Sequence, residues 1–182
     1  MSVNHFTGEV LQWKPKIHRD DRGVFYESYN EIDFNKRVGS DVRFVQDNHS
    51  ISSRGVIRGL HYQLPPAEQG KLVRVTRGSV FDVVVDLRRS SPYFGRWSGY
   101  ELKEANHIQL WIPPGFAHGF MALVDGTEVQ YKTTHVHTPD REGTIRWNDP
   151  EIGINWPIEA AQPIVSRRDG AAPPLAQAEI FD

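Results

Sequence analysis

Short runs of apolar and β-branched residues, separated by glycine and proline, set the pattern of this chain. Runs rich in Val, Ile, Phe, Tyr and Thr predict β-strands. One segment, residues 31–38, predicts a helix of about two turns. Many short strands with frequent turns favour an all-β sandwich or a closed double-sheet barrel of jelly-roll type. The predicted strands cover residues 24–29, 42–49, 56–63, 72–76, 79–87, 108–112 and 128–136.

The clearest alternation lies in residues 80–87, which predict a strand with one apolar face. Phe81, Val83, Val85 and Leu87 share that face, and Asp82 and Asp86 share the other. Positions four residues apart on a strand are roughly 13 Å apart, too far for two carboxylates to hold one ion. We therefore expect Asp82 and Asp86 to be structural or solvent-facing.

The length of 182 residues suits a single domain covering residues 1–182. The last stretch, from residue 149 to 182, is rich in proline. It is predicted to wrap the barrel with short helices and loops.

Composition narrows the class of protein further. The chain has 38% hydrophobic and 24% charged residues, which allows a globular core. A net charge of −2 argues against nucleic acid as a partner, and the absence of cysteine excludes disulfides, zinc–thiolate sites and thiol nucleophiles. The sequence has no apolar run of the roughly 18 residues that a membrane span needs, and residues 1–16 lack a signal-peptide pattern. A cytoplasmic protein with no membrane partner is expected.

Candidate chemistry gathers on a few predicted strands. Gln46 and Asn48 share one face and could bind a polar ligand, although a strand end turning into solvent explains them equally well. His61 and Gln63 lie on one side of another strand, and Lys71 begins the next.

One segment resembles the second half-motif of cupin barrels. Residues 113–120, Pro-Pro-Gly-Phe-Ala-His-Gly-Phe, place His118 as the second half-motif does. Metal-binding cupins usually supply two histidines one residue apart and a glutamate from the first half-motif, whereas this chain has His61-Tyr62-Gln63. Two histidines without an obvious carboxylate make a poor transition-metal site. The pattern therefore favours acid–base chemistry with no metal, because a free histidine can act as a general base near neutral pH.

Ordered motifs along nearly the whole chain resemble the dTDP-4-dehydrorhamnose 3,5-epimerase family. Each motif alone is weak, but together and in this order they are specific. They are residues 21–30 (DRGVFYESYN), 45–50 (VQDNHS), 58–63 (RGLHYQ), 70–74 (GKLVR), 83–88 (VVVDLR), 114–120 (PGFAHGF), 131–134 (YKTT) and 145–150 (IRWNDP), with Ser166 and Asp169.

The resemblance implies an all-β fold, a cupin-type jelly-roll barrel with short peripheral helices, that needs no cofactor and forms a homodimer with exchanged N-terminal strands. It implies an isomerase that inverts C3 and C5 of a dTDP-linked 4-keto-6-deoxyhexose. In it, His61 removes a proton next to the C4 ketone and Asp169 hydrogen-bonds His61. Lys71 stabilises the enolate oxygen with His118 nearby, and Tyr131 returns a proton from the opposite face. This division suits a carbon acid, which needs a base, an acid and a positive group at the oxyanion.

The resemblance also implies a nucleotide-binding set, in which planar guanidinium groups suit a diphosphate. Phe25 is expected to pack beside the ligand. The polar and charged members are Arg22, Glu27, Gln46, Asn48, Arg58, Glu142 and Arg168.

The chain departs from the family pattern at two places. After residues 131–134 the family usually continues with Asp and two aromatics, but this chain has His135-Val136-His137. Arg168 stands where the family often has lysine. His49, His107, His135 and His137 are expected to be non-catalytic.

Four alternatives stay open. They are a single-centre epimerase of a related nucleotide sugar, a nucleotide-sugar 3,4-ketoisomerase, a metal-dependent cupin oxygenase using His61 and His118, and a non-catalytic sugar-binding jelly roll.

A geometric question about residues 58 and 61 is also open. Strict alternation puts Arg58 and His61 on opposite faces of one strand, so a shared site requires a bulge at Gly59 or a site shared with a partner chain.

Overall fold

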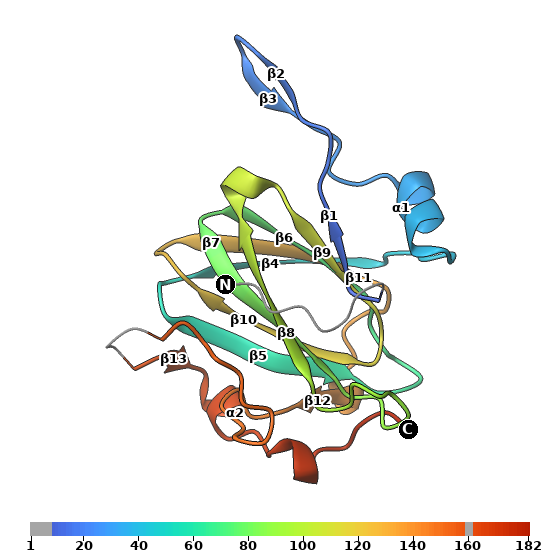
Figure 1. Ribbon diagram of the computed structural model, residues 1–182, viewed down its shortest axis with the longest axis vertical. Coiled ribbons are helices and arrows are strands. Elements are labelled where there is room, and N and C mark those ends of the chain that lie inside the picture. The colour runs from blue at the N-terminus through green and yellow to red at the C-terminus, as the bar shows by residue number, and fades with distance from the viewer. Residues whose placement is uncertain (1–8, 159–161) are drawn as a thin grey trace.

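The computed structural model describes residues 9–158 and 162–182, and most of its regular structure is β-strand (Figure 1). One sheet has five strands and the other has six, and a separate hairpin pairs β2 (His18–Asp20) with β3 (Gly23–Phe25). The five-stranded sheet contains, in order, β1 (Leu11–Trp13), β9 (Gln109–Ile112), β6 (Lys71–Arg77), β11 (Thr127–Thr133) and β4 (Gln46–Ser52).

The six-stranded sheet is built around β5, which has neighbours on both edges. In order it contains β12 (Glu142–Thr144), β5 (Val56–Gln63), β10 (Phe116–Ala122), β7 (Ser79–Asp86) and β8 (Trp97–Lys103). The last strand, β13 (Ile164–Val165), pairs with β5 in parallel.

The helices are short. They are α1 (Glu31–Val38), α2 (Arg167–Gly170) and 3₁₀ turns at Glu104–Asn106, Pro139–Arg141 and Leu175–Gln177. In the described ranges no helix is long and apolar enough to cross a membrane.

The two sheets face each other across an apolar layer, which is the packing of a jelly-roll sandwich. Val73 and Val129 come from the five-stranded sheet, and Val80, Val84 and Phe120 come from the six-stranded sheet. The predicted cupin-type jelly-roll architecture is therefore confirmed.

Strand β7 is buried on both faces, which decides in favour of the structural role of the two that the sequence left open for its carboxylates. Its predicted apolar face, including Phe81 and Val83, packs under the C-terminal segment rather than between the sheets. The other face points into the sandwich, so Asp82 and Asp86 are fully buried and not solvent-facing. Each has a partner there, because Asp82 contacts His118 and Asp86 forms an ion pair with Arg88.

The described part of residues 149–182 covers the outer face of the six-stranded sheet with short elements, as the proline-rich sequence predicts (Figure 1). Trp156, Leu175 and Phe181 supply the apolar contacts. Residues 1–8 and 159–161 of the predicted single domain lie outside the described residues.

At the other end of the chain, helix α1 matches its predicted bounds. The Asn30 side chain accepts hydrogen bonds from the amides of Ile32 and Asp33, and Gly39 ends the helix with a φ of 72°. Buried Phe34 packs on Leu72 of the five-stranded sheet. The β2–β3 hairpin, by contrast, projects away from the two sheets (Figure 1).

Candidate active site

A cavity of about 680 Å³ opens between the two sheets. Its walls come from β4, β6 and β11 on one side and β5, β10 and β12 on the other, with α2 at its edge. The structure brings together here ten of the thirteen residues that the sequence singles out. They are Gln46, Asn48, Arg58, His61, Lys71, His118, Tyr131, Glu142, Arg168 and Asp169.

A bulge in β5 explains how Arg58 and His61 line the same cavity. The register against β10 shifts, because His118 pairs with His61 while Phe120 pairs with Arg58. One extra residue on β5 therefore changes which face the side chains take. Gly59 permits the bulge: its φ is 126°, and a Cβ there would lie 2.6 Å from the Cα of Gly119. The open geometric question is thus settled within one chain.

His61 forms a short polar contact with a buried carboxylate. Its Nε2 atom lies 2.7 Å from Oδ1 of Asp169, whose Oδ2 accepts a hydrogen bond of 3.2 Å from the backbone amide of Gly59. Burial works to raise the pKa of Asp169, but the bonds from His61 and Gly59 outweigh it and hold that pKa below its ordinary value. An ionised Asp169 fixes the ring of His61 and stabilises its protonated form.

Lys71 begins β6 and is only 6% exposed, which excludes the simple interpretation of a solvated strand end. Its Nζ donates a hydrogen bond of 3.1 Å to the carbonyl oxygen of His61 on the opposite sheet. Burial lowers the pKa of Lys71 to about 8, and the carboxylates of Glu142 and Asp82 oppose that shift. The site thus holds a poorly solvated ammonium group beside the candidate base.

Tyr131 lies on β11 and reaches the same cavity from the five-stranded sheet. Its ring meets the ring of His118 edge to face, with 6.4 Å between the centroids. Burial, aided by the charge of Glu142 and opposed by Arg58, raises the pKa of Tyr131. The phenol therefore stays protonated at neutral pH and can act as an acid.

A second histidine–carboxylate pair lies deeper in the sandwich. Nε2 of His118 is 3.0 Å from Oδ2 of Asp82, and both side chains are almost fully buried. The sequence pattern does not reveal this role of Asp82. The available signal was an acidic residue in an otherwise apolar strand.

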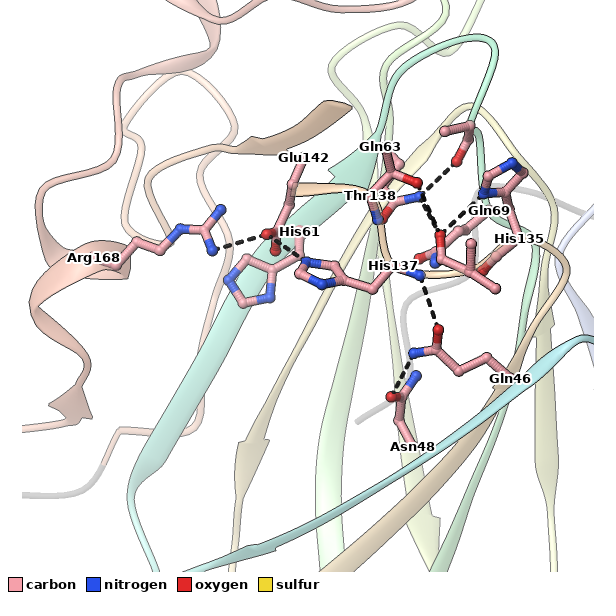
Figure 2. A network of polar contacts seen from close by, with 12 residues as sticks. Gln46, Asn48, His61, Gln63, Gln69, His135, His137, Thr138, Glu142 and Arg168 are labelled. Atoms are coloured by element: carbon pink, nitrogen blue, oxygen red, sulfur yellow. Dashed lines mark hydrogen bonds and ion pairs between the residues drawn. The ribbon is translucent and has the colours of Figure 1, made fainter. Parts of the chain in front are cut away.

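Glu142 on β12 binds two side chains through one oxygen, as Figure 2 shows. Its Oε2 lies 2.8 Å from Nη1 of Arg168 and 3.0 Å from Nε2 of His137. Burial works to raise the pKa of Glu142, but the bonds from His137 and Arg168 and the nearby His61 hold it below its ordinary value. Glu142 is therefore an anion that acts on the charges of the other cavity residues.

The backbone of the segment 135–138 is held by the side chains of three glutamines (Figure 2). Gln46 accepts from the amide of His137 at 2.8 Å, and Gln69 donates to the carbonyl of His135 at 2.8 Å. Gln63 donates to the carbonyl of Val136 at 3.2 Å and accepts from the amide of Thr138 at 2.8 Å. The sequence does not reveal this set, because hydrogen bonds between segments this far apart leave no local pattern.

The amide of Gln63 is thus turned to this segment, although Gln63 stands where a metal-binding cupin has its second histidine. Within residues 9–158 and 162–182, no three His, Asp or Glu side chains are grouped as metal ligands.

Three predicted nucleotide-binding residues do not reach the cavity of their own chain. Arg22 lies on the β2–β3 hairpin, where its side chain is 90% exposed and pairs with Asp20. Phe25 is 74% exposed. Glu27 accepts a hydrogen bond of 3.4 Å from Asn30, outside the cavity.

Known proteins that are similar to this chain point to one family. A family model described as dTDP-4-dehydrorhamnose 3,5-epimerase matches residues 7–177. A protein of that name from Pseudomonas aeruginosa is 53% identical over 95% of this chain and 94% of its own length.

Two solved structures are also similar. A dTDP-6-deoxy-D-glucose-3,5-epimerase from Legionella pneumophila in complex with dTDP-4-keto-L-rhamnose is 45% identical, with a TM-score of 0.91, over 97% of this chain and 93% of that chain. A 3'-monoepimerase from Streptomyces bikiniensis in complex with dTDP-quinovose is 34% identical, with a TM-score of 0.88, over 97% of this chain and 88% of that chain.

Proposed function

This chain belongs to the dTDP-4-dehydrorhamnose 3,5-epimerase family, and we propose that its cavity residues invert C3 and C5 of dTDP-4-keto-6-deoxyglucose by moving protons across the sugar ring. The enzyme is an isomerase that acts on a sugar nucleotide. C3 and C5 both adjoin the C4 ketone, so a proton on either carbon is acidic enough for a side-chain base to remove.

His61 is the base in this proposal. It takes the proton from the carbon, the C–H electron pair moves into a C=C bond, and the negative charge moves to the C4 oxygen. Asp169 at 2.7 Å stabilises the resulting imidazolium. Lys71 stabilises the enolate oxygen as a cation, with His118 close to the same cavity surface.

Tyr131 completes the inversion. Its phenol gives a proton to the carbon from the face opposite His61, and the C4 ketone re-forms. The raised pKa of Tyr131 supports this role, because the acid must hold its proton at neutral pH. Exchange of both groups with water then restores the starting protonation states.

The observation that supports this proposal most directly is that His61 and Tyr131, on opposite sheets, line one cavity together with Lys71. The test is a proton NMR time course with dTDP-4-keto-6-deoxyglucose in D₂O. We expect deuterium at C3 and C5 and formation of dTDP-4-keto-L-rhamnose. Absence of solvent exchange with intact enzyme and substrate would refute the proposal.

A single-centre epimerase is the second candidate. The chain has His135-Val136-His137 where an acidic residue and two aromatics are expected, and His137 lines the cavity. A structure similar to this one belongs to a 3'-monoepimerase. The same NMR experiment separates the two, because deuterium at one carbon alone supports the second candidate.

The assembly we propose is a homodimer in which each N-terminal segment reaches its partner. Arg22 and Phe25 lie on an exposed hairpin away from their own cavity. An exposed arginine and an exposed phenylalanine on one hairpin suit a neighbour's nucleotide better than open solvent. The cytoplasmic location stays a prediction.

A further inference from the structure

His137 lies at the cavity edge, and the mechanism above gives it no role. Its side chain is 53% exposed, and its Nε2 contacts Oε2 of Glu142 at 3.0 Å. The same Oε2 receives Nη1 of Arg168 at 2.8 Å. Two donors on one oxygen leave the other carboxylate oxygen outside this contact. His137 and Arg168 therefore share one oxygen of Glu142.

Arginine and carboxylate groups pair most strongly through two parallel hydrogen bonds. Here, Arg168 contacts Glu142 through Nη1, on the same oxygen that His137 contacts. The Arg168 side chain is 57% exposed and lines the cavity. In the described part of the chain, its other N–H groups make no protein hydrogen bond, so they can bind phosphate oxygens.

The position of His137 does not depend on its own ring. Its backbone amide donates to Gln46, and Gln63 holds the residues on either side. Gln63 also pairs with Glu142 in the register of β5 and β12. Gln63 thus contacts both the segment that carries His137 and the strand that carries Glu142, and it sets the spacing between them.

We propose that His137 is a positioning residue for the nucleotide sugar: through Glu142, it keeps the guanidinium of Arg168 turned to the substrate diphosphate. This inference rests on the proposed function, because it assigns a diphosphate to Arg168. Without the imidazole, Glu142 is free to take Arg168 in a two-bond pair, which removes phosphate-binding N–H groups from the cavity.

The first test measures binding of dTDP and of thymidine by calorimetry, using His137→Phe. Hydrogen bonds to charged groups are strong enough that we expect dTDP to bind roughly tenfold more weakly, while thymidine binding is unchanged. In steady-state assays, KM should rise by a similar factor with little change in kcat. Equal weakening of both ligands, or no weakening of dTDP, would overturn the inference.

Two further variants separate positioning from a structural effect. His137→Gln keeps a donor that can reach Glu142 and should restore most of the dTDP affinity. In an Arg168→Met background, His137→Phe should cause no further loss, and a full second loss would contradict an action through Arg168. If His137→Phe does not fold, His137→Asn, whose shorter amide cannot reach Glu142, replaces it.

His135→Phe is the matched control. His135 lies in the same segment, but its Nδ1 contacts the carbonyl of Val136 at 3.0 Å rather than Glu142. It should bind dTDP as the wild type does, and a loss equal to that of His137→Phe would overturn the inference. The wild-type solvent-exchange assay separately tests the proposed function, so a dTDP-specific loss without any exchange activity would leave this inference standing while the epimerase proposal fails.

Discussion

Nε2 of His61 and Oδ1 of Asp169 lie 2.7 Å apart, although the two residues are 108 positions apart in the chain. The C-terminal segment closes this distance by laying β13 along β5 and placing α2 next to it. The base and its carboxylate thus come from different structural layers. Catalysis consequently depends on how the C-terminal segment packs as well as on the sandwich.

Asp169→Asn should lower kcat by about 10²-fold or more, because an amide neither stabilises the imidazolium of His61 nor fixes its tautomer. Thermal stability should change little, since asparagine can still accept from the Gly59 amide. Solvent exchange at C3 and C5 measures the effect, and Asp47→Asn, in an exposed ion pair with Lys132, is the control. Exchange at the wild-type rate in Asp169→Asn would remove Asp169 from the mechanism.

Tyr131→Phe should separate exchange from inversion. His61 can still remove a proton and return a deuteron on its own face, but no acid serves the opposite face. We expect deuterium uptake without the change in configuration, and epimerisation slower by about 10²–10⁴-fold. NMR coupling constants distinguish the two products. Normal inversion in Tyr131→Phe would assign the acid role elsewhere.

Activity should fall as the pH rises through about 8, because the enolate needs Lys71 in its cationic form and burial lowers its pKa to that value. The charge of Asp82 raises the pKa of Lys71, and Asp82→Asn removes that charge. The alkaline limb of the pH profile of kcat should therefore move to lower pH. Glu101→Gln, which removes an exposed partner of Lys103, should leave the limb in place. A limb that does not move in Asp82→Asn would mean that another group produces it.

The same burial of the Lys71 ammonium group lowers the free energy of unfolding. Between the folded pKa of about 8 and the ordinary value of 10.5, the unfolded chain binds more protons, so stability from this group rises with pH across that window. Lys71→Met should remove that slope and stabilise the protein at pH 7 by up to about 3 kcal/mol, while it abolishes exchange. Denaturant unfolding at pH 7 and pH 10 measures both effects. Loss of stability at pH 7 would show that the ammonium supports the fold.

Mixed dimers test whether the N-terminal hairpin serves the partner. An Arg22→Ala chain and a His61→Ala chain should each be nearly inactive alone. Mixed after co-expression, they should regain activity, because the intact cavity of the Arg22→Ala chain receives Arg22 from the other chain. Failure to regain activity would place Arg22 in the cavity of its own chain or outside the site.

Elements with clear local signals could be predicted from the sequence. The runs at β6 and β7 are rich in β-branched residues, and the helix α1 has a capping asparagine and a terminal glycine. The predicted strand at 42–49 instead begins at Gln46 as β4, and the one at 24–29 overlaps β3 only at Val24 and Phe25. The sequence pattern does not predict β8 or β10. All seven residues of β10, Phe-Ala-His-Gly-Phe-Met-Ala, are buried between β5 and β7, so it shows no alternation between polar and apolar positions.

The candidate site followed from the sequence where a residue could be placed by resemblance, as with His61, Lys71 and Tyr131. What the sequence could not give was the pairing of distant side chains. Asp82 meets His118 because β7 and β10 are adjacent in a register that only the folded sheet defines. For the way Arg58 reaches the cavity, the sequence left two explanations open: a bulge at Gly59 and a site shared with a partner chain.

The three glutamines that hold the segment 135–138 bind its main chain and not its side chains. The shape of that segment is thereby largely independent of which amino acid occupies position 137. Exchanges there can therefore change what the cavity edge presents to the ligand while the segment keeps its shape, so ligand binding can be tuned at position 137 without rebuilding the fold.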